Sequence, residues 1–73
     1  MMFSVFYKID EIVKKYTESY ALSNRAPDLK VVLTALVTDE EKEFILNDID
    51  YTLRDLVDFS HTYDNGKLQI VFN

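Results

Sequence analysis

The sequence predicts a single α+β domain over residues 1–73, with two amphipathic helices packed on a small, mainly antiparallel three-stranded sheet. Apolar residues recur at helical spacing in two stretches, and β-branched residues gather in a third. The 48% of hydrophobic and 29% of charged residues are typical of a folded globular chain. The expected order of elements is α-β-β-α-β, and no internal repeat is apparent.

The first helix is expected over residues 4–22, with Ser4 as its N-cap. Its apolar residues fall in one stripe of a helical wheel and are Val5, Ile9, Ile12, Val13, Tyr16 and Tyr20. An edge strand over residues 1–6 is the alternative for the start of the chain. Pro27 disfavours a helical conformation at the residue before it, so the helix must end earlier.

A strand is expected over residues 29–37, where β-branched residues are enriched. Its odd positions, which share one face, are all apolar: Leu29, Val31, Leu33, Ala35 and Val37.

Residues 38–47 allow two interpretations. Thr38 and Glu41 match a capping box, which would start a helix. Alternatively, residues 38–41 turn a hairpin and residues 42–47 form its second strand. The hairpin is favoured, because the consecutive apolar residues Phe44, Ile45 and Leu46 point in three directions on a helix.

The second helix is expected to be capped at its start by Asn47 or Asp48, and its residues Ile49, Leu53, Leu56, Val57 and Ser60 share one face. Asn65 or Gly66 suits the left-handed conformation that ends a helix. Residues 67–72 alternate between apolar and other positions and predict the last strand.

These elements define an expected core. It consists of Val5, Ile9, Ile12, Val13, Tyr16, Leu33, Ala35, Ile49, Leu53, Leu56, Val57, Ile70 and Phe72.

Catalytic and metal-binding functions have little support in the sequence. Cysteine is absent and His61 is the only histidine, so thiolate chemistry and imidazole-rich sites are excluded. Asp48 and Asp50 match the start of a calcium loop, but the glycine and the final glutamate of that motif are missing. We expect a protein that is not an enzyme and that carries no cofactor and no metal.

The location of the protein is expected to be cytoplasmic. The first residues include Lys8, Asp10 and Glu11 and do not match a signal peptide. No apolar run approaches the roughly 18 residues of a membrane span.

Charge is distributed unevenly along the chain. Residues 1–37 carry five basic and four acidic side chains, whereas residues 38–64 carry nine acidic and two basic ones, a balance of −7. Such a field attracts basic partners, and the net charge of −5 disfavours direct binding of nucleic acid. The expected partner-binding residues are Asp39, Glu40, Glu41, Glu43, Asp48, Tyr51, Asp55, Asp58 and Phe59.

In size and acidity the chain resembles small bacteriophage host-takeover proteins that inhibit DNA-binding proteins by DNA mimicry. The resemblance rests on Asp39, Glu40, Glu41, Glu43, Asp48, Asp50, Asp55 and Asp58. It implies that carboxylates stand in for phosphates and occupy the basic DNA groove of a host target, such as a histone-like nucleoid protein. The expected function is therefore a non-enzymatic inhibitor or regulator that binds a basic protein.

The alternative is a structural homodimer or accessory subunit that associates through an apolar face of the sheet. Two helices do not easily cover both faces of a sheet, and a small chain gains stability by hiding an apolar patch. The residues expected in the contact are Val32, Leu36, Ile45 and Val71. A helix on each face would instead give a compact monomer.

Overall fold

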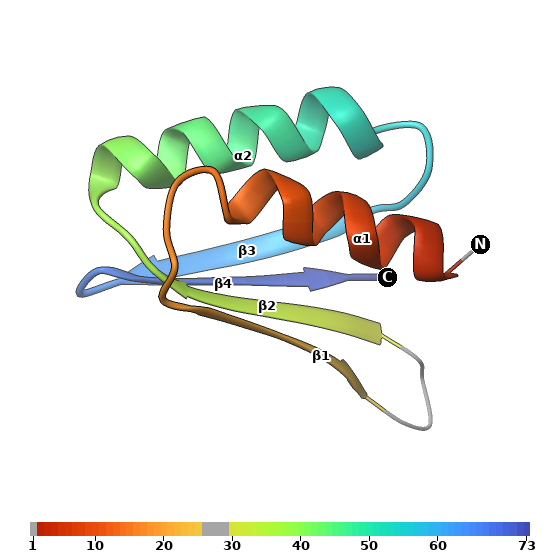
Figure 1. Ribbon diagram of the computed structural model, residues 1–73, viewed down its shortest axis with the longest axis horizontal. Helices are drawn as coiled ribbons and strands as arrows, with labels where there is room; N and C mark the ends of the chain where they lie inside the picture. The colour runs from red at the N-terminus through yellow and green to blue at the C-terminus, as the bar shows by residue number, and fades with distance from the viewer. Residues whose placement is uncertain (1, 26–29) are drawn as a thin grey trace.

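The computed structural model describes residues 2–25 and 30–73, which form a layer of helices on a layer of strands (Figure 1). In chain order the elements are α1 (Met2–Val13), β1 (Tyr20–Arg25), β2 (Lys30–Leu36), α2 (Asp39–Leu53), β3 (Phe59–Asp64) and β4 (Lys67–Phe72). The α+β class is confirmed, but the order is α-β-β-α-β-β and the sheet has four strands rather than three.

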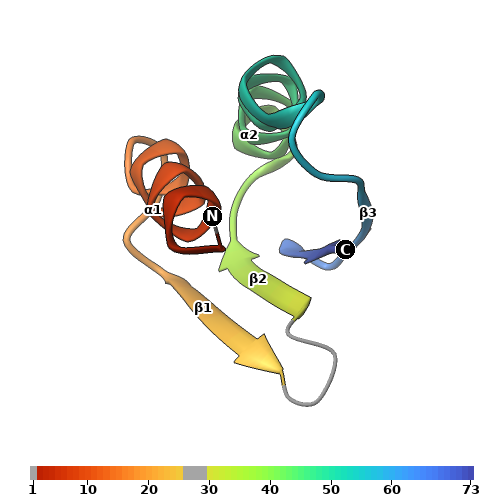
Figure 2. The ribbon, with the colours of Figure 1, turned by 90° about the vertical axis from the view of Figure 1, so that its right-hand side faces the viewer.

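The sheet is antiparallel throughout, with the strand order β1-β2-β4-β3. Two of the three expected strands form, as β2 and β4, and they pair with each other at the centre of the sheet, where Leu33 lies opposite Ile70. Leu29 and Pro27 lie outside the described residues. Both helices cover the same face of the sheet, as expected (Figure 2).

The first helix is shorter than predicted. It ends at Val13, and Tyr20 and Leu22 belong to strand β1. Thr17 fixes the intervening turn, because its hydroxyl accepts a hydrogen bond from the Ser19 amide (3.0 Å) and donates one to the Leu36 carbonyl (3.2 Å). The helix begins before Ser4, so neither the Ser4 cap nor a strand over residues 1–6 forms.

The hairpin favoured for residues 38–47 is wrong, and so is the helix start at Asn47 or Asp48. A single helix, α2, begins after Thr38. The capping box forms: the Glu41 amide donates to the Thr38 hydroxyl (3.1 Å), and the Thr38 amide donates to the Glu41 carboxylate (2.9 Å). These bonds satisfy amides that would otherwise lack partners at the helix start.

Strand β3 was predicted as the end of the second helix, which instead stops at Leu53. Asn65 and Gly66 do adopt positive φ angles, of 50° and 80°, but they turn the hairpin between β3 and β4. An Asn-Gly pair is the strongest short sequence signal for such a two-residue hairpin, because both of its residues tolerate positive φ angles, so the expected helix end at this pair is wrong.

The core lies between the helices and the sheet. It contains the expected residues except Leu56, which is 57% exposed, and Tyr16 and Val57, which are partly buried at its margin. Val31, Val37, Ile45 and Leu68 also belong to it, although the expected core set does not include them. Within the described residues, no helix has the length and apolar character needed to span a membrane.

The fold consists of two helix–strand–strand units. The first is α1–β1–β2 and the second is α2–β3–β4, and the helices run side by side in opposite directions (Figure 1). Because β2 and β4 are antiparallel neighbours at the centre, the two units are related by an approximate twofold axis through the sheet.

Equivalent hydrogen bonds support this internal repeat. Two successive amides after α1 donate to the Val13 carbonyl at 2.9 and 3.1 Å, and two after α2 donate to the Leu53 carbonyl at the same distances. Each helix buries residues at spacings of four: Val5, Ile9 and Val13 in α1, and Ile45, Ile49 and Leu53 in α2. The repeat is therefore one of structure, although the sequence does not display it.

Candidate interaction surface

The outward side of α2 carries a row of five exposed residues, which we call the α2 stripe. They are Glu40, Phe44, Asn47, Tyr51 and Asp55. Their spacings of three and four residues place them on one side of a helix, opposite the buried Ile45, Ile49 and Leu53. Asp55 lies in the turn that follows the helix. Tyr51 and Asp55 were expected at a partner site, whereas Phe44 and Asn47 were missed because a hairpin was favoured there.

Two aromatic rings lie on the α2 stripe. Phe44 is 48% exposed and stacks on Tyr16, with ring centres 5.8 Å apart. Tyr51 is 81% exposed, the highest value among the large apolar and aromatic side chains that the structure describes. The folded chain therefore buries only about half of the Phe44 side chain and very little of the Tyr51 side chain.

The acidic residues of the first turn have structural roles. Glu41 completes the capping box. Asp39 and Glu40 lie at the N-terminus of α2, where the helix dipole favours negative charge. These three residues therefore do not by themselves indicate a binding site.

Two acidic residues of α2 pair within the helix. Glu43 lies 3.2 Å from the Lys42 ammonium, and Asp50 lies 3.3 Å from the Arg54 guanidinium. The carboxylates remain 65% and 60% exposed, so these pairs contribute little to stability and leave the charges open to a partner.

Asp48 joins the two helices. Its carboxylate accepts hydrogen bonds from the Tyr16 hydroxyl (2.6 Å) and the Lys15 ammonium (3.1 Å). The bond from Tyr16 and then the bond from Lys15 hold the pKa of Asp48 below its ordinary value. The same contacts raise the pKa of Tyr16 and of Lys15. Asp48 was expected in the partner site, but its charge is already used in holding α1 against α2.

The last expected residues lie at the C-terminal end of α2. Asp55 and Asp58 line an open depression of about 330 Å³, together with Arg54 and Asn73. Phe59 follows in β3, where it is half-buried and packs on Phe72 with ring centres 5.8 Å apart. The structure thus brings Asp55 and Asp58 together and places Phe59 at the margin of the core.

The residues expected in a dimer contact divide between two places. Val32, Leu36 and Val71 lie on the face of the sheet that the helices leave open, with Val32 and Val71 directly opposite each other. Leu36 is 60% exposed and Val32 only 8%. Ile45 belongs to α2 and is fully buried in the core on the other side of the sheet, so it does not belong to this patch.

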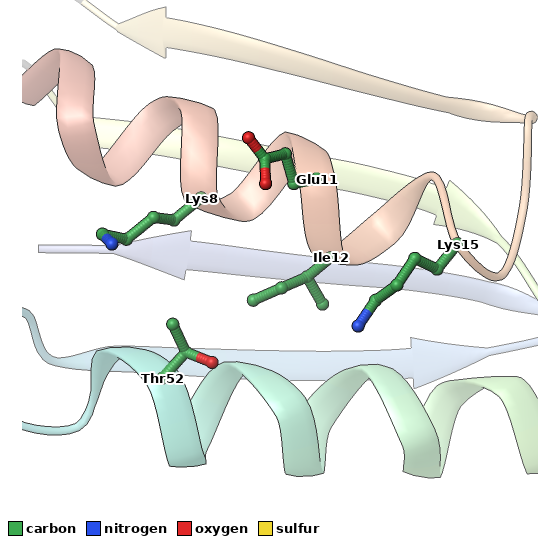
Figure 3. A pocket seen from close by; sticks show the side chains of 5 residues that line it. All are labelled: Lys8, Glu11, Ile12, Lys15 and Thr52. Atoms are coloured by element: carbon green, nitrogen blue, oxygen red, sulfur yellow. The ribbon is translucent and has the colours of Figure 1, made fainter.

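A groove separates the outer surfaces of the helices. Figure 3 shows Ile12 of α1 and Lys15 of the following turn pointing towards α2, with Lys8 between the two helices and Thr52 of α2 on the opposite side. The depression measures about 270 Å³ and is open to solvent. Its ammonium groups and hydroxyl do not form a nucleophile–base pair of the kind that covalent catalysis requires.

The residues that the sequence suggests for catalysis or metal binding do not form a site. Ser60 and His61 are neighbours in β3, so their side chains point to opposite faces of the sheet and do not form a nucleophile–base pair. Asp48 and Asp50 flank the buried Ile49 on α2, which is not the loop that a calcium site requires. Among the described residues, no cluster of metal-binding side chains occurs.

In comparisons with known proteins, no family profile and no curated protein matches the sequence.

Proposed function

We propose that this protein is a non-enzymatic inhibitor or regulator that binds a basic protein surface through the α2 stripe. The observation that carries the proposal is the 81% exposure of Tyr51 between the acidic ends of the stripe, Glu40 and Asp55. Aromatic side chains are enriched in protein–protein interfaces and are often the residues that dominate binding energy. Exposed Tyr51 and Phe44 therefore provide the contact area of the proposed interface.

The charge distribution indicates that the partner surface is positively charged. The segment 38–64 carries a net charge of −7, while residues 1–37 carry +1. A field of one sign over one side of the molecule accelerates encounters with an oppositely charged surface and disfavours like-charged partners. The partner is therefore proposed to be a basic protein.

The proposed class of partner is a DNA-binding protein. The stripe has one carboxylate near each end, Glu40 and Asp55, separated by about 22 Å along the axis given a rise of about 1.5 Å per residue. With the exposed Glu43 and Asp50 on the neighbouring side of α2, they offer negative groups along an axis, as one strand of a nucleic-acid duplex offers phosphates. A protein that occupies the DNA groove of its target in this way excludes DNA without binding DNA itself.

Charge reversal tests the proposal. Asp55→Lys combined with Asp58→Lys changes two exposed residues and should leave the circular-dichroism spectrum unchanged. It should abolish low-salt capture of a basic protein from a bacterial lysate, and the wild-type protein should lose that partner in high salt. The matched control reverses two exposed acidic residues elsewhere, Glu11→Lys with Glu18→Lys, and should retain capture. Equal capture by both double variants would refute the proposal.

A homodimer is the second candidate function. It is favoured by one observation: both helices cover one face of the sheet, and the other face displays Leu36 at 60% exposure beside Val32 and Val71. A second copy placed on this face would bury Leu36 and the remaining exposed part of Val71, next to Val32, which is already buried.

Sedimentation equilibrium tests the homodimer. The wild-type protein should sediment at twice 8.6 kDa at micromolar concentration, and Leu36→Asp should return it to 8.6 kDa, because a carboxylate would be desolvated in the contact. A wild-type mass of 8.6 kDa throughout would exclude this candidate.

A further inference from the structure

Strand β3 leaves one side of its backbone without a partner strand in the sheet. It is the last strand in the order β1-β2-β4-β3 and, among the strands that the structure describes, pairs with β4 alone. At its start, the Asn73 amide of the neighbouring chain segment donates to the Asp58 carbonyl at 2.9 Å. In an antiparallel ladder the residues alternate between those that bond to the neighbour and those that point away. Phe59, His61 and Tyr63 therefore direct their amides and carbonyls towards the free edge.

This edge lacks the usual protection against a further strand. Natural edge strands carry lysine, proline or a bulge that prevents pairing with other chains. Between Phe59 and Tyr63, β3 contains no lysine, arginine, carboxylate or proline. The register with β4 runs without a bulge over all six residues. The edge is thus regular enough to accept another strand.

Acidic residues frame the edge at both ends and above it. Asp58 and Asp64 are exposed at the two ends of β3. Lys42 lies on the side of α2 that faces β3, because its ammonium is 4.8 Å from the centre of the Tyr63 ring. Helical spacing places Asp39, Glu43 and Asp50 on the outer part of that side; all three are exposed.

The two edges of the sheet differ in the charge of the residues that lie near them. At the other edge, the Tyr20 hydroxyl of β1 donates a hydrogen bond to Asp10 of α1, and the exposed Lys14, whose amide donates to the Asp10 carbonyl, follows directly after the helix. The side of α1 above β1 is therefore not uniformly acidic, and charge complementarity selects the β3 edge for a basic chain.

We propose that an extended basic segment of the partner adds to β3 as a fifth strand. Its backbone would pair with Phe59, His61 and Tyr63, and its alternate Lys or Arg side chains on the helix side would approach Asp39, Glu43 and Asp50. Strand addition gives affinity through main-chain hydrogen bonds and specificity through alternate side chains. This inference rests on the proposed function and specifies the partner as one with an exposed basic strand or tail.

A second copy of this chain fits the edge less well. When β3 pairs with itself about a twofold axis at His61, Asp58 of each chain faces Asp64 of the other. Like charges directly opposite each other destabilise a strand pair. The charges therefore favour a basic chain over self-pairing.

The test uses a short synthetic peptide in which Lys and Val alternate, added to the 73-residue protein labelled with ¹⁵N. We expect the amides of Phe59, His61 and Tyr63 to exchange with solvent quickly in the free protein and slowly with the peptide. The amides of Ser60 and Thr62, which point to β4, should already exchange slowly. A peptide of the same sequence with N-methyl groups on alternate residues should give no protection.

A matched pair of variants supplies the second readout. His61→Pro removes an amide that points away from β4, a position where edge strands tolerate proline. It should weaken peptide binding at least about tenfold, whereas His61→Ala should bind as the wild type does. If His61→Pro does not fold, the exchange pattern of the wild-type protein still shows whether the peptide pairs with β3.

Two results would overturn the strand addition. One is the absence of peptide binding, and the other is binding without protection of Phe59, His61 and Tyr63. Neither would refute the proposed function if a basic protein is still captured through the α2 stripe. Formation of larger assemblies by the protein alone, with protection of the same three amides, would instead assign the edge to a second copy and also overturn the inference.

Discussion

Asp48 is the residue at which the two helices meet. It accepts hydrogen bonds from Tyr16 and Lys15, and Tyr16 in turn stacks on Phe44 of α2. One carboxylate therefore connects the turn after α1 to the helix that carries the candidate site. Because its partners keep the pKa of Asp48 low, this contact depends on the ionised form.

We predict that Asp48→Asn destabilises the protein at neutral pH and not in acid. A carboxylate with a lowered pKa stabilises the fold above its unfolded pKa of about 3.9 and loses that contribution as the pH falls through its folded value. Urea unfolding of both proteins should show a difference in free energy that shrinks below about pH 4. Asp55→Asn, at an exposed site beyond the helix, is the control. A difference that stays constant in acid would contradict this role.

Two neighbouring positions on α2 should respond very differently to alanine. Ile49 is fully buried and Tyr51 is 81% exposed. Ile49→Ala should lower the free energy of unfolding by about 2–5 kcal/mol, because it leaves a cavity, whereas Tyr51→Ala should change it by less than about 0.5 kcal/mol. Chemical denaturation measures both. A large loss at Tyr51 would mean that its ring stabilises the fold, which would remove the main support for the binding proposal.

At the scale of elements, a strand could be predicted only where its own sequence favours a strand strongly. Strands β2 and β4 could be predicted because β-branched residues and alternation agree there. The edge strands β1 and β3 could not, because their apolar residues are few. Tyr20 continues a helical spacing from α1, and the polar residues of β3 resemble the end of a helix. These strands form because β1 pairs with β2 and β3 pairs with β4. Such pairing joins distant segments and is not visible in a local sequence pattern.

The candidate site was predictable in composition but not in geometry. The acidic segment and Tyr51 are evident in the sequence. Which of these residues face outward depends on α2 starting at Asp39, because a helix and a strand distribute the same residues over different faces. The capping box at Thr38 was the signal that could have identified the start.

We predict that Thr38→Ala lowers the free energy of unfolding by about 1 kcal/mol, since it removes the side chain that accepts a hydrogen bond from the helix start. Thr52→Ala changes an exposed threonine near the other end of α2 and should have a smaller effect. Thermal unfolding followed by circular dichroism compares the two. Equal effects would show that the capping box does not stabilise α2.

For the whole molecule, the repeat of two helix–strand–strand units explains how a chain of 73 residues without cysteine forms one core. Each unit contributes one helix and one central strand, and the buried residues of both meet on one side of the sheet. The units differ mainly on their surfaces. The second carries most of the acidic charge, so a symmetric framework presents an asymmetric field.

The central claim is that the α2 stripe occupies the DNA site of a basic protein, and displacement of DNA tests it most directly. Fluorescence anisotropy would follow labelled duplex DNA bound to a histone-like nucleoid protein as this protein is added. Wild type and Tyr7→Ala, a control at an exposed tyrosine of α1, should release the DNA. Tyr51→Ala combined with Asp55→Lys should require at least about tenfold more protein. DNA that stays bound, or equal release by the two variants, would contradict the claim.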